Sequence, residues 1–129
     1  MSFDWTEYLK LAKNLVGDTK ELANDQAKQR SSISRAYYAA HCSARNFIER
    51  KEKRRIKRTG DAHDEVIRYF FKLGQKQKNQ DFLKISSNLT SLKIERAFVD
   101  YRNKLKGNLS QKIVFVLKYA DYIVSSLKP

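Results

Sequence analysis

Apolar residues recur at steps of three and four along most of the chain, a spacing that places them on one face of an α-helix. It predicts helices over residues 4–16, from about 18 or 24 to beyond 52, over 61–73, and from about 108 or 110 to 127. Residues 75–80 are expected to form a polar loop, followed by a short helix at 82–85 that is interrupted at 86–88. A firmer helix then ends at Gly107. Its predicted buried face consists of Ile94, Ala97, Phe98, Tyr101 and Leu105.

Turn-forming residues are scarce. The only proline is Pro129, four glycines occur, and no Asn-Gly or Asp-Gly pair marks a β-hairpin. The sequence therefore predicts an all-α fold. We expect one domain over residues 1–129, an up-down bundle of four main helices with one or two shorter ones.

Composition adds a strong charge bias to this picture. The chain has 129 residues, of which 41% are hydrophobic, and 27 Lys+Arg against 14 Asp+Glu give a net charge of +13. The longest apolar run, residues 113–117, is far shorter than the roughly 20 residues that span a bilayer. We expect no secretory signal and no membrane association, and the single cysteine, Cys42, suits a cytoplasmic protein. The excess positive charge predicts attraction to polyanions.

The basic residues are densest at 50–58, where seven positive charges accompany one negative charge. Such a run is either a solvated helix end or a phosphate-binding segment, and the basic character of the whole chain favours the second interpretation. No sequence-specific RNA- or DNA-reading motif accompanies it. The candidate RNA- or anion-binding residues are Arg35, Arg54, Arg55, Lys57, Arg58 and Arg102.

Metal and cofactor motifs are missing from the sequence. The two histidines, His41 and His63, lie far apart, and no Cys-x-x-Cys, His-Glu-x-x-His or glycine-rich phosphate loop occurs. We expect neither a metal nor a cofactor. Cys42 follows His41 directly, but neighbours on a helix do not face each other, so Cys42 is expected to pack in the core.

Two helical segments stand out for other reasons. Small residues at Ala36, Ala39, Ala40 and Ala44 permit close helix packing, either within the chain or across a homodimer. Arg96 and Asp100 are four residues apart and are expected to pair on one helix face. We expect a homodimer whose contact includes the alanine-rich face and the helix that carries Arg96.

Three blocks of sequence together resemble the HEPN domain superfamily, in particular its small stand-alone prokaryotic members. These are SRAYYAA at 34–40, AH at 62–63 ahead of VI at 66–67 and Phe70, and Arg96 with DY at 100–101. The resemblance implies a helical bundle that forms homodimers. Many members are similar to metal-independent ribonucleases and act as toxins beside a small nucleotidyltransferase. Their active site pairs an arginine with a histidine that follows after four to six intervening residues.

This chain departs from that pattern. After Arg96 the permitted positions hold Tyr101, Arg102 and Asn103, and after Arg102 they also lack histidine. Attack by a ribose 2′-hydroxyl needs a general base with a pKa near 7, whereas a free tyrosine phenol titrates at about 10.

We therefore expect a non-catalytic or weakly active protein that binds RNA or a protein partner, within a toxin–antitoxin or defence system. Two alternatives stay open: a ribonuclease with an atypical site of Arg96, Tyr101 and His63, and a purely structural assembly protein. For His63 alone, the favoured interpretation is a residue that caps or packs at its helix end.

Overall fold

The structure is a computed structural model that describes residues 3–16, 26–102 and 109–128. It is an all-α bundle, and no strand occurs in these ranges. Four longer helices and one shorter helix are described, as the sequence predicts. Their bounds are α1 (Thr6–Leu15), α3 (Gln26–Glu52), α4 (Ala62–Gln77), α5 (Gln80–Tyr101) and α6 (Leu109–Ser126).

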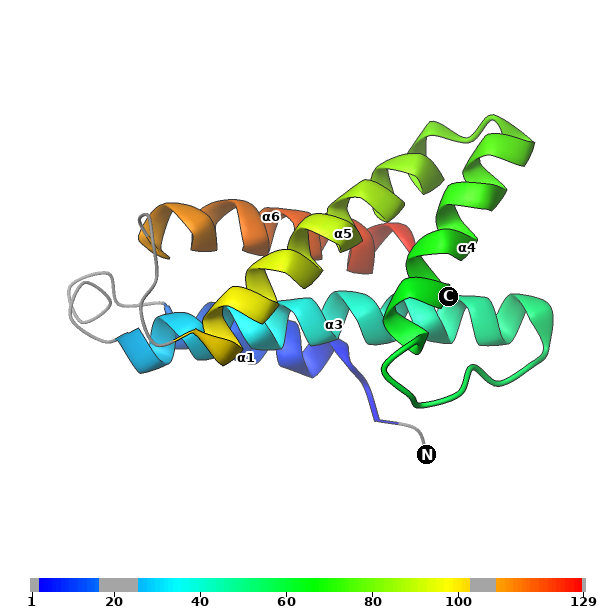
Figure 1. Cartoon of the computed structure of the whole chain (residues 1–129). Coiled ribbons are helices and arrows are strands. Elements are labelled where there is room, and N and C mark those ends of the chain that lie inside the picture. Colours follow the sequence, from blue (N-terminus) through cyan, green and yellow to red (C-terminus); the bar gives the residue numbers. More distant parts are fainter. Residues whose placement is uncertain (1–2, 17–25, 103–108, 129) are drawn as a thin grey trace.

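Helix α3 is the central element, and α1, α5 and α6 all pack along it. Figure 1 shows α6 running alongside α3, while α4 and α5 form a hairpin inclined to both. The two segments proposed as starts of α3, near residues 18 and 24, lie outside the described residues. Within the described ranges no helix combines the length and apolarity that crossing a membrane requires.

The alanine-rich face of α3 is used for packing within the chain. Ala36, Ala39, Ala40 and Ala44 have no exposed surface, because small side chains let the neighbouring helices approach closely. The prediction that this face contributes to a dimer contact is therefore wrong. Cys42 is also buried, which confirms that it packs in the core.

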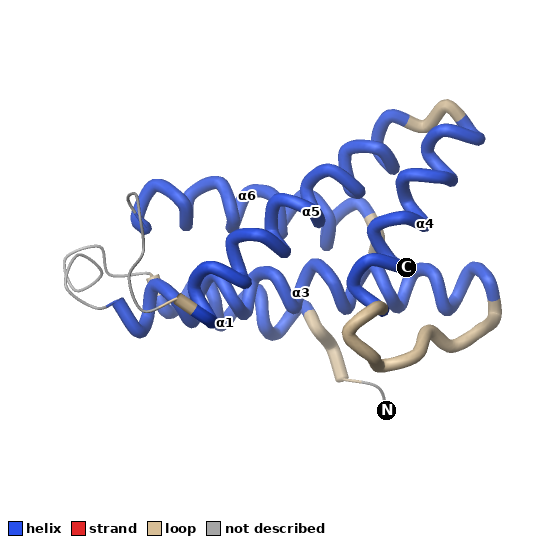
Figure 2. The backbone as a smooth tube through the Cα atoms, viewed as in Figure 1, coloured by secondary structure: helices blue, strands red, loops and turns tan. Residues whose placement is uncertain are grey.

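The α4–α5 connection is shorter than the predicted loop at 75–80. Helix α4 continues to Gln77, and only Lys78 and Asn79 separate it from α5 (Figure 2). Lys78 adopts a left-handed conformation, and the Asn79 side chain accepts a hydrogen bond from the backbone N–H of Phe82 at 3.2 Å. Gly74 permits this tight turn, since a Cβ there would lie 2.8 Å from Cγ of Leu83.

Helix α5 runs without the predicted interruption at 86–88. Ser86 lies inside the helix, and its hydroxyl donates to the carbonyl oxygen of Ile67 on α4 at 3.1 Å. This tertiary contact satisfies a side chain that would otherwise favour a helix end. The helix also ends at Tyr101 rather than at Gly107, which lies outside the described residues.

The buried face of α5 is not the predicted one. Ile94 and Tyr101 are 50% and 75% exposed, and Ala97 is exposed as well. Of the other two predicted residues, Phe98 is half-buried and Leu105 lies outside the described residues. The side turned toward the core instead carries Leu92, Arg96 and Val99. The fold therefore buries an arginine and leaves a strip of apolar side chains in solvent.

Candidate functional site

Arg96 lies in a box of aromatic rings. The residue is only 9% exposed, and its guanidinium carbon lies 5.2 Å from the ring centre of Tyr37 and 5.5 Å from that of Tyr38. The third ring belongs to Tyr101, whose hydroxyl accepts a hydrogen bond from Nη1 of Arg96 at 3.2 Å. Stacking on rings suits a planar, weakly hydrated guanidinium.

The charge of Arg96 is poorly neutralised. The predicted pair with Asp100 forms, but its N–O distance of 3.7 Å is long for a charge-assisted hydrogen bond. Nε of Arg96 is buried and has no hydrogen-bond partner among the described residues. Buried polar groups are nearly always hydrogen-bonded, and a buried guanidinium that keeps an unused donor is a feature of binding sites rather than of cores.

His63 joins this cluster through Tyr37. The Tyr37 hydroxyl is hydrogen-bonded to Nδ1 of His63, and the His63 ring stacks on that of His41 with centroids 4.3 Å apart. Helix α3 supplies Tyr37 and His41, whereas His63 is the second residue of α4. The three candidate catalytic residues, Arg96, Tyr101 and His63, therefore belong to one connected cluster.

Both histidines are held neutral. Burial lowers the pKa of His41 to about 3, with further contributions from nearby His63 and Arg45. Burial also lowers the pKa of His63, and the positive charges of Arg96 and Lys93 add to the effect.

The Tyr37 phenol keeps its proton. Burial raises the pKa of this phenol, and its hydroxyl forms a hydrogen bond with Nδ1 of the neutral His63 ring. A histidine whose pKa is lowered by burial is a weaker base, which suits binding more than abstraction of a proton.

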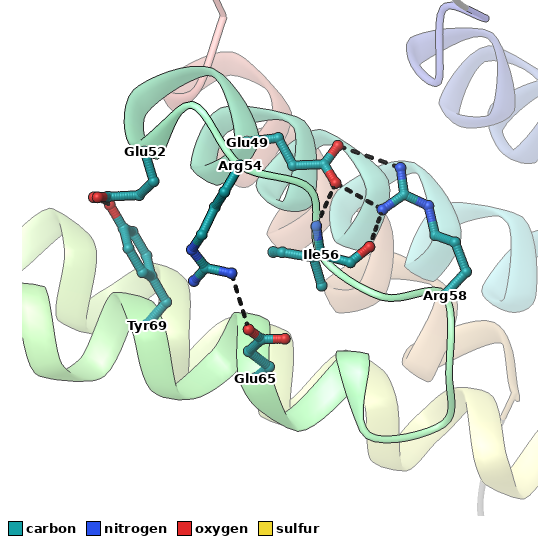
Figure 3. Close-up of polar contacts among 7 residues, drawn as sticks. All are labelled: Glu49, Glu52, Arg54, Ile56, Arg58, Glu65 and Tyr69. Carbon is teal, nitrogen blue, oxygen red and sulfur yellow. Dashed lines mark hydrogen bonds and ion pairs between the residues drawn. The ribbon is translucent and has the colours of Figure 1, made fainter.

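The loop that carries the basic run, residues 53–61, folds back against the bundle. Lys53 takes a left-handed conformation and ends α3, and Ile56 is buried to 1% exposure between charged neighbours. Figure 3 shows how Glu49 fixes the loop: its carboxylate accepts from the backbone N–H of Ile56 at 2.8 Å and from Arg58 at 2.7 Å. The hydrogen bonds from Arg58 are the largest cause that holds the pKa of the Glu49 carboxyl below its usual value.

The four basic candidates in this loop divide into two kinds. Arg54 pairs with Glu65 of α4 at 3.2 Å, and Arg58 pairs with Glu49 (Figure 3). Arg55 and Lys57 are exposed and have no ion-pair partner in the described part of the chain. The first two shape the loop, and the second two point cationic groups to solvent.

Arg35 and Arg102 do not join this loop. The Arg35 guanidinium covers the ring of Tyr8 on α1 at 4.9 Å. Arg102 follows α5 and covers the ring of Phe98 at 4.4 Å, and its carbonyl accepts from Arg30 near the start of α3. Arg102 therefore lies beside the start of α3, whereas the loop begins where α3 ends.

Within the ranges that the structure describes, no three His, Cys, Asp or Glu side chains lie close enough together to hold a metal ion. No protein-family model matches the sequence, and no curated protein or solved structure shows significant similarity to it.

Proposed function

We propose that the protein is a HEPN-like helical module that binds RNA through the 53–61 loop and does not cleave it. One observation carries the proposal: Glu49 and Ile56 hold the loop in a fixed shape, while Arg55 and Lys57 stay exposed and unpaired among the described residues. A pre-shaped loop loses little conformational entropy when it binds. Its cations gain energy from phosphates of any sequence, by release of counterions.

RNA binding is expected to depend strongly on salt. If about five phosphates of a single strand are neutralised, the slope of log affinity against log salt is about −3.5. In Arg55→Gln/Lys57→Gln the slope should become shallower by about 1.4, because two phosphate contacts are lost. Fluorescence anisotropy with a labelled single-stranded RNA between about 50 and 200 mM salt measures both slopes.

The matched control is Lys76→Gln/Lys118→Gln, which removes the same charge from exposed positions on α4 and α6. Its slope should stay close to that of the wild type. Equal slopes for all three proteins would contradict binding at the loop, and absence of RNA binding at low salt would contradict the proposed function.

The cluster around Arg96 favours a second candidate, a metal-independent endoribonuclease with an atypical site. Arg96, Tyr101 and His63 are connected through Tyr37, which is the arrangement that such a site would use. The pKa of His63, which burial lowers, argues against it, because a weaker base accepts the 2′-hydroxyl proton less readily. We therefore place this function second.

The exposed strip on α5 supports the proposed homodimer. Ile94 and Tyr101 lie on one side of the helix, seven residues apart, and large apolar side chains in solvent are typical of interfaces. Light scattering at tens of micromolar should give twice the chain mass of 15.1 kDa. Ile94→Glu should give a monomer, and a monomeric wild type would contradict the proposal.

A protein partner is the remaining part of the proposal. A nucleotidyltransferase encoded beside this chain would support a toxin–antitoxin role. A purely structural assembly role would instead show as dimer formation without any RNA binding.

A further inference from the structure

A small pocket opens between the start of α1, the middle of α3 and the start of α4. Its volume is about 210 Å³. Four of its residues come from one face of α3, at steps of three and four residues, and the loop and α4 supply others. The residues that matter to its chemistry are Trp5, Tyr38, His41, Arg45, Arg58 and His63.

The pocket offers donors and no carboxylate. None of the residues that line it is Asp or Glu. Nε of Arg45 is buried without a hydrogen-bond partner among the described residues, and its guanidinium lies 5.5 Å from the ring centre of Trp5. No ion pair to Arg45 occurs in the described ranges, whereas Arg58 is already paired with Glu49.

Two histidines also line the pocket. His41 is 5% exposed, lines the pocket, and makes ring contacts but no hydrogen bond with the residues the structure describes. His63 lines the same pocket, and its Nδ1 is hydrogen-bonded with the Tyr37 hydroxyl. The unpaired guanidinium of Arg45 can only donate, so this site favours an acceptor, and best an anion.

We infer that this pocket binds the terminal phosphate of an RNA chain, an inference that rests on the proposed RNA binding. Its volume is below the roughly 300 Å³ of pockets that hold whole drug-sized ligands, so it accommodates a phosphate and part of a sugar. A terminal monoester also carries about −1.5 to −2 charge at pH 7, more than an internal diester.

The surface beside the pocket fits the sugar and base of the terminal nucleotide. A larger hollow of about 570 Å³ shares Trp5, Arg45 and Arg58 with the pocket. It adds Phe3, Asn46, Arg50 and Glu49, whose carboxylate is paired with Arg58. Phe3 and Trp5 present aromatic rings 4.9 Å apart, and aromatic side chains are the usual platform for unpaired bases. The terminal base therefore has a ring to stack on next to the phosphate site.

The test compares one short single-stranded RNA with a 5′-phosphate, with a 3′-phosphate, and with hydroxyls at both ends, each labelled internally. One terminal phosphate should raise the affinity about tenfold over the hydroxyl form, because it gains charge-assisted hydrogen bonds. The end that shows the preference identifies which terminus the pocket takes. In Arg45→Gln this affinity ratio should fall to about one.

The control Lys84→Gln also removes a cation that covers an aromatic ring, that of Tyr122 at 4.3 Å, and it should keep the ratio. If Arg45→Gln fails to fold, as judged by circular dichroism, Thr59→Glu replaces it, because Thr59 is exposed and lines the pocket. The introduced carboxylate should likewise abolish the preference.

Equal affinities of wild type for all three RNAs would overturn the inference while leaving RNA binding intact. A ratio that survives in both pocket variants would overturn it as well. Displacement of the RNA by inorganic phosphate alone, without preference for a phosphorylated end, would assign the pocket to a free anion and also overturn it. If no form of the RNA binds, the proposed function itself fails.

Discussion

Ile56→Ala is expected to lower the free energy of unfolding by about 2–4 kcal/mol. Ile56 is the only apolar residue in the basic run and is 1% exposed, so the substitution removes three buried carbon atoms and leaves a cavity. The backbone N–H of Ile56 also donates to Glu49, and the loop therefore depends on this residue for its position. Urea unfolding followed by circular dichroism measures the change.

Lys57→Ala is the matched control for stability, because Lys57 is the exposed neighbour of Ile56. Its effect should stay within about 0.5 kcal/mol, as is usual for surface positions. If Ile56→Ala changes stability as little as Lys57→Ala, the loop is not anchored as the structure indicates. In that case the loop is not shaped in advance for RNA binding.

The helices could be predicted from the sequence because apolar periodicity records which residues each helix buries. The pattern does not say which of two apolar faces is buried. In α5 one face carries Ile94 and Tyr101, and another carries Leu92 and Val99 at a similar spacing. Only the positions of α3 and α6 decide between them. Arg96 lies between Leu92 and Val99, so the choice of face also decides that this arginine is buried.

The candidate site was predictable in part. Arg96 and Asp100 are four residues apart on one helix, and their contact follows from that spacing. The row Tyr38, His41, Cys42 and Arg45 has steps of three and four residues and could have indicated a polar face on α3. The link from His63 to Tyr37 spans 26 residues and depends on the path of the 53–61 loop, which no local pattern encodes.

For the 53–61 loop, the sequence predicted more free cations than the structure shows. Its charge predicted an anion-binding segment, and the structure adds that Arg54 and Arg58 are engaged by Glu65 and Glu49. Counting charges therefore overestimates the cations that are free to meet phosphate. The carboxylates that engage them come from two different helices, and their partners could not be assigned from the sequence.

Purified protein is expected to leave labelled single-stranded RNA intact in EDTA, at the level of a mock preparation. Cleavage by a 2′-hydroxyl needs a base that is free to accept a proton near neutral pH. His41 is buried with a pKa lowered to about 3 by burial, and burial lowers the pKa of His63 as well. Neither histidine meets that requirement, although both lie close to Arg96.

Arg96→Ala decides between this expectation and an active site of unusual composition. In an active enzyme the Arg96 guanidinium would stabilise the charge that develops on phosphorus, and its loss would slow cleavage by about 100-fold or more. In a non-catalytic protein the same substitution removes contacts to Tyr37, Tyr38 and Tyr101 and leaves the background rate unchanged. Arg35→Ala, another arginine that covers a tyrosine ring, controls for loss of positive charge. Cleavage that the wild type and Arg35→Ala share and that Arg96→Ala loses would overturn the non-catalytic function and establish the ribonuclease in its place.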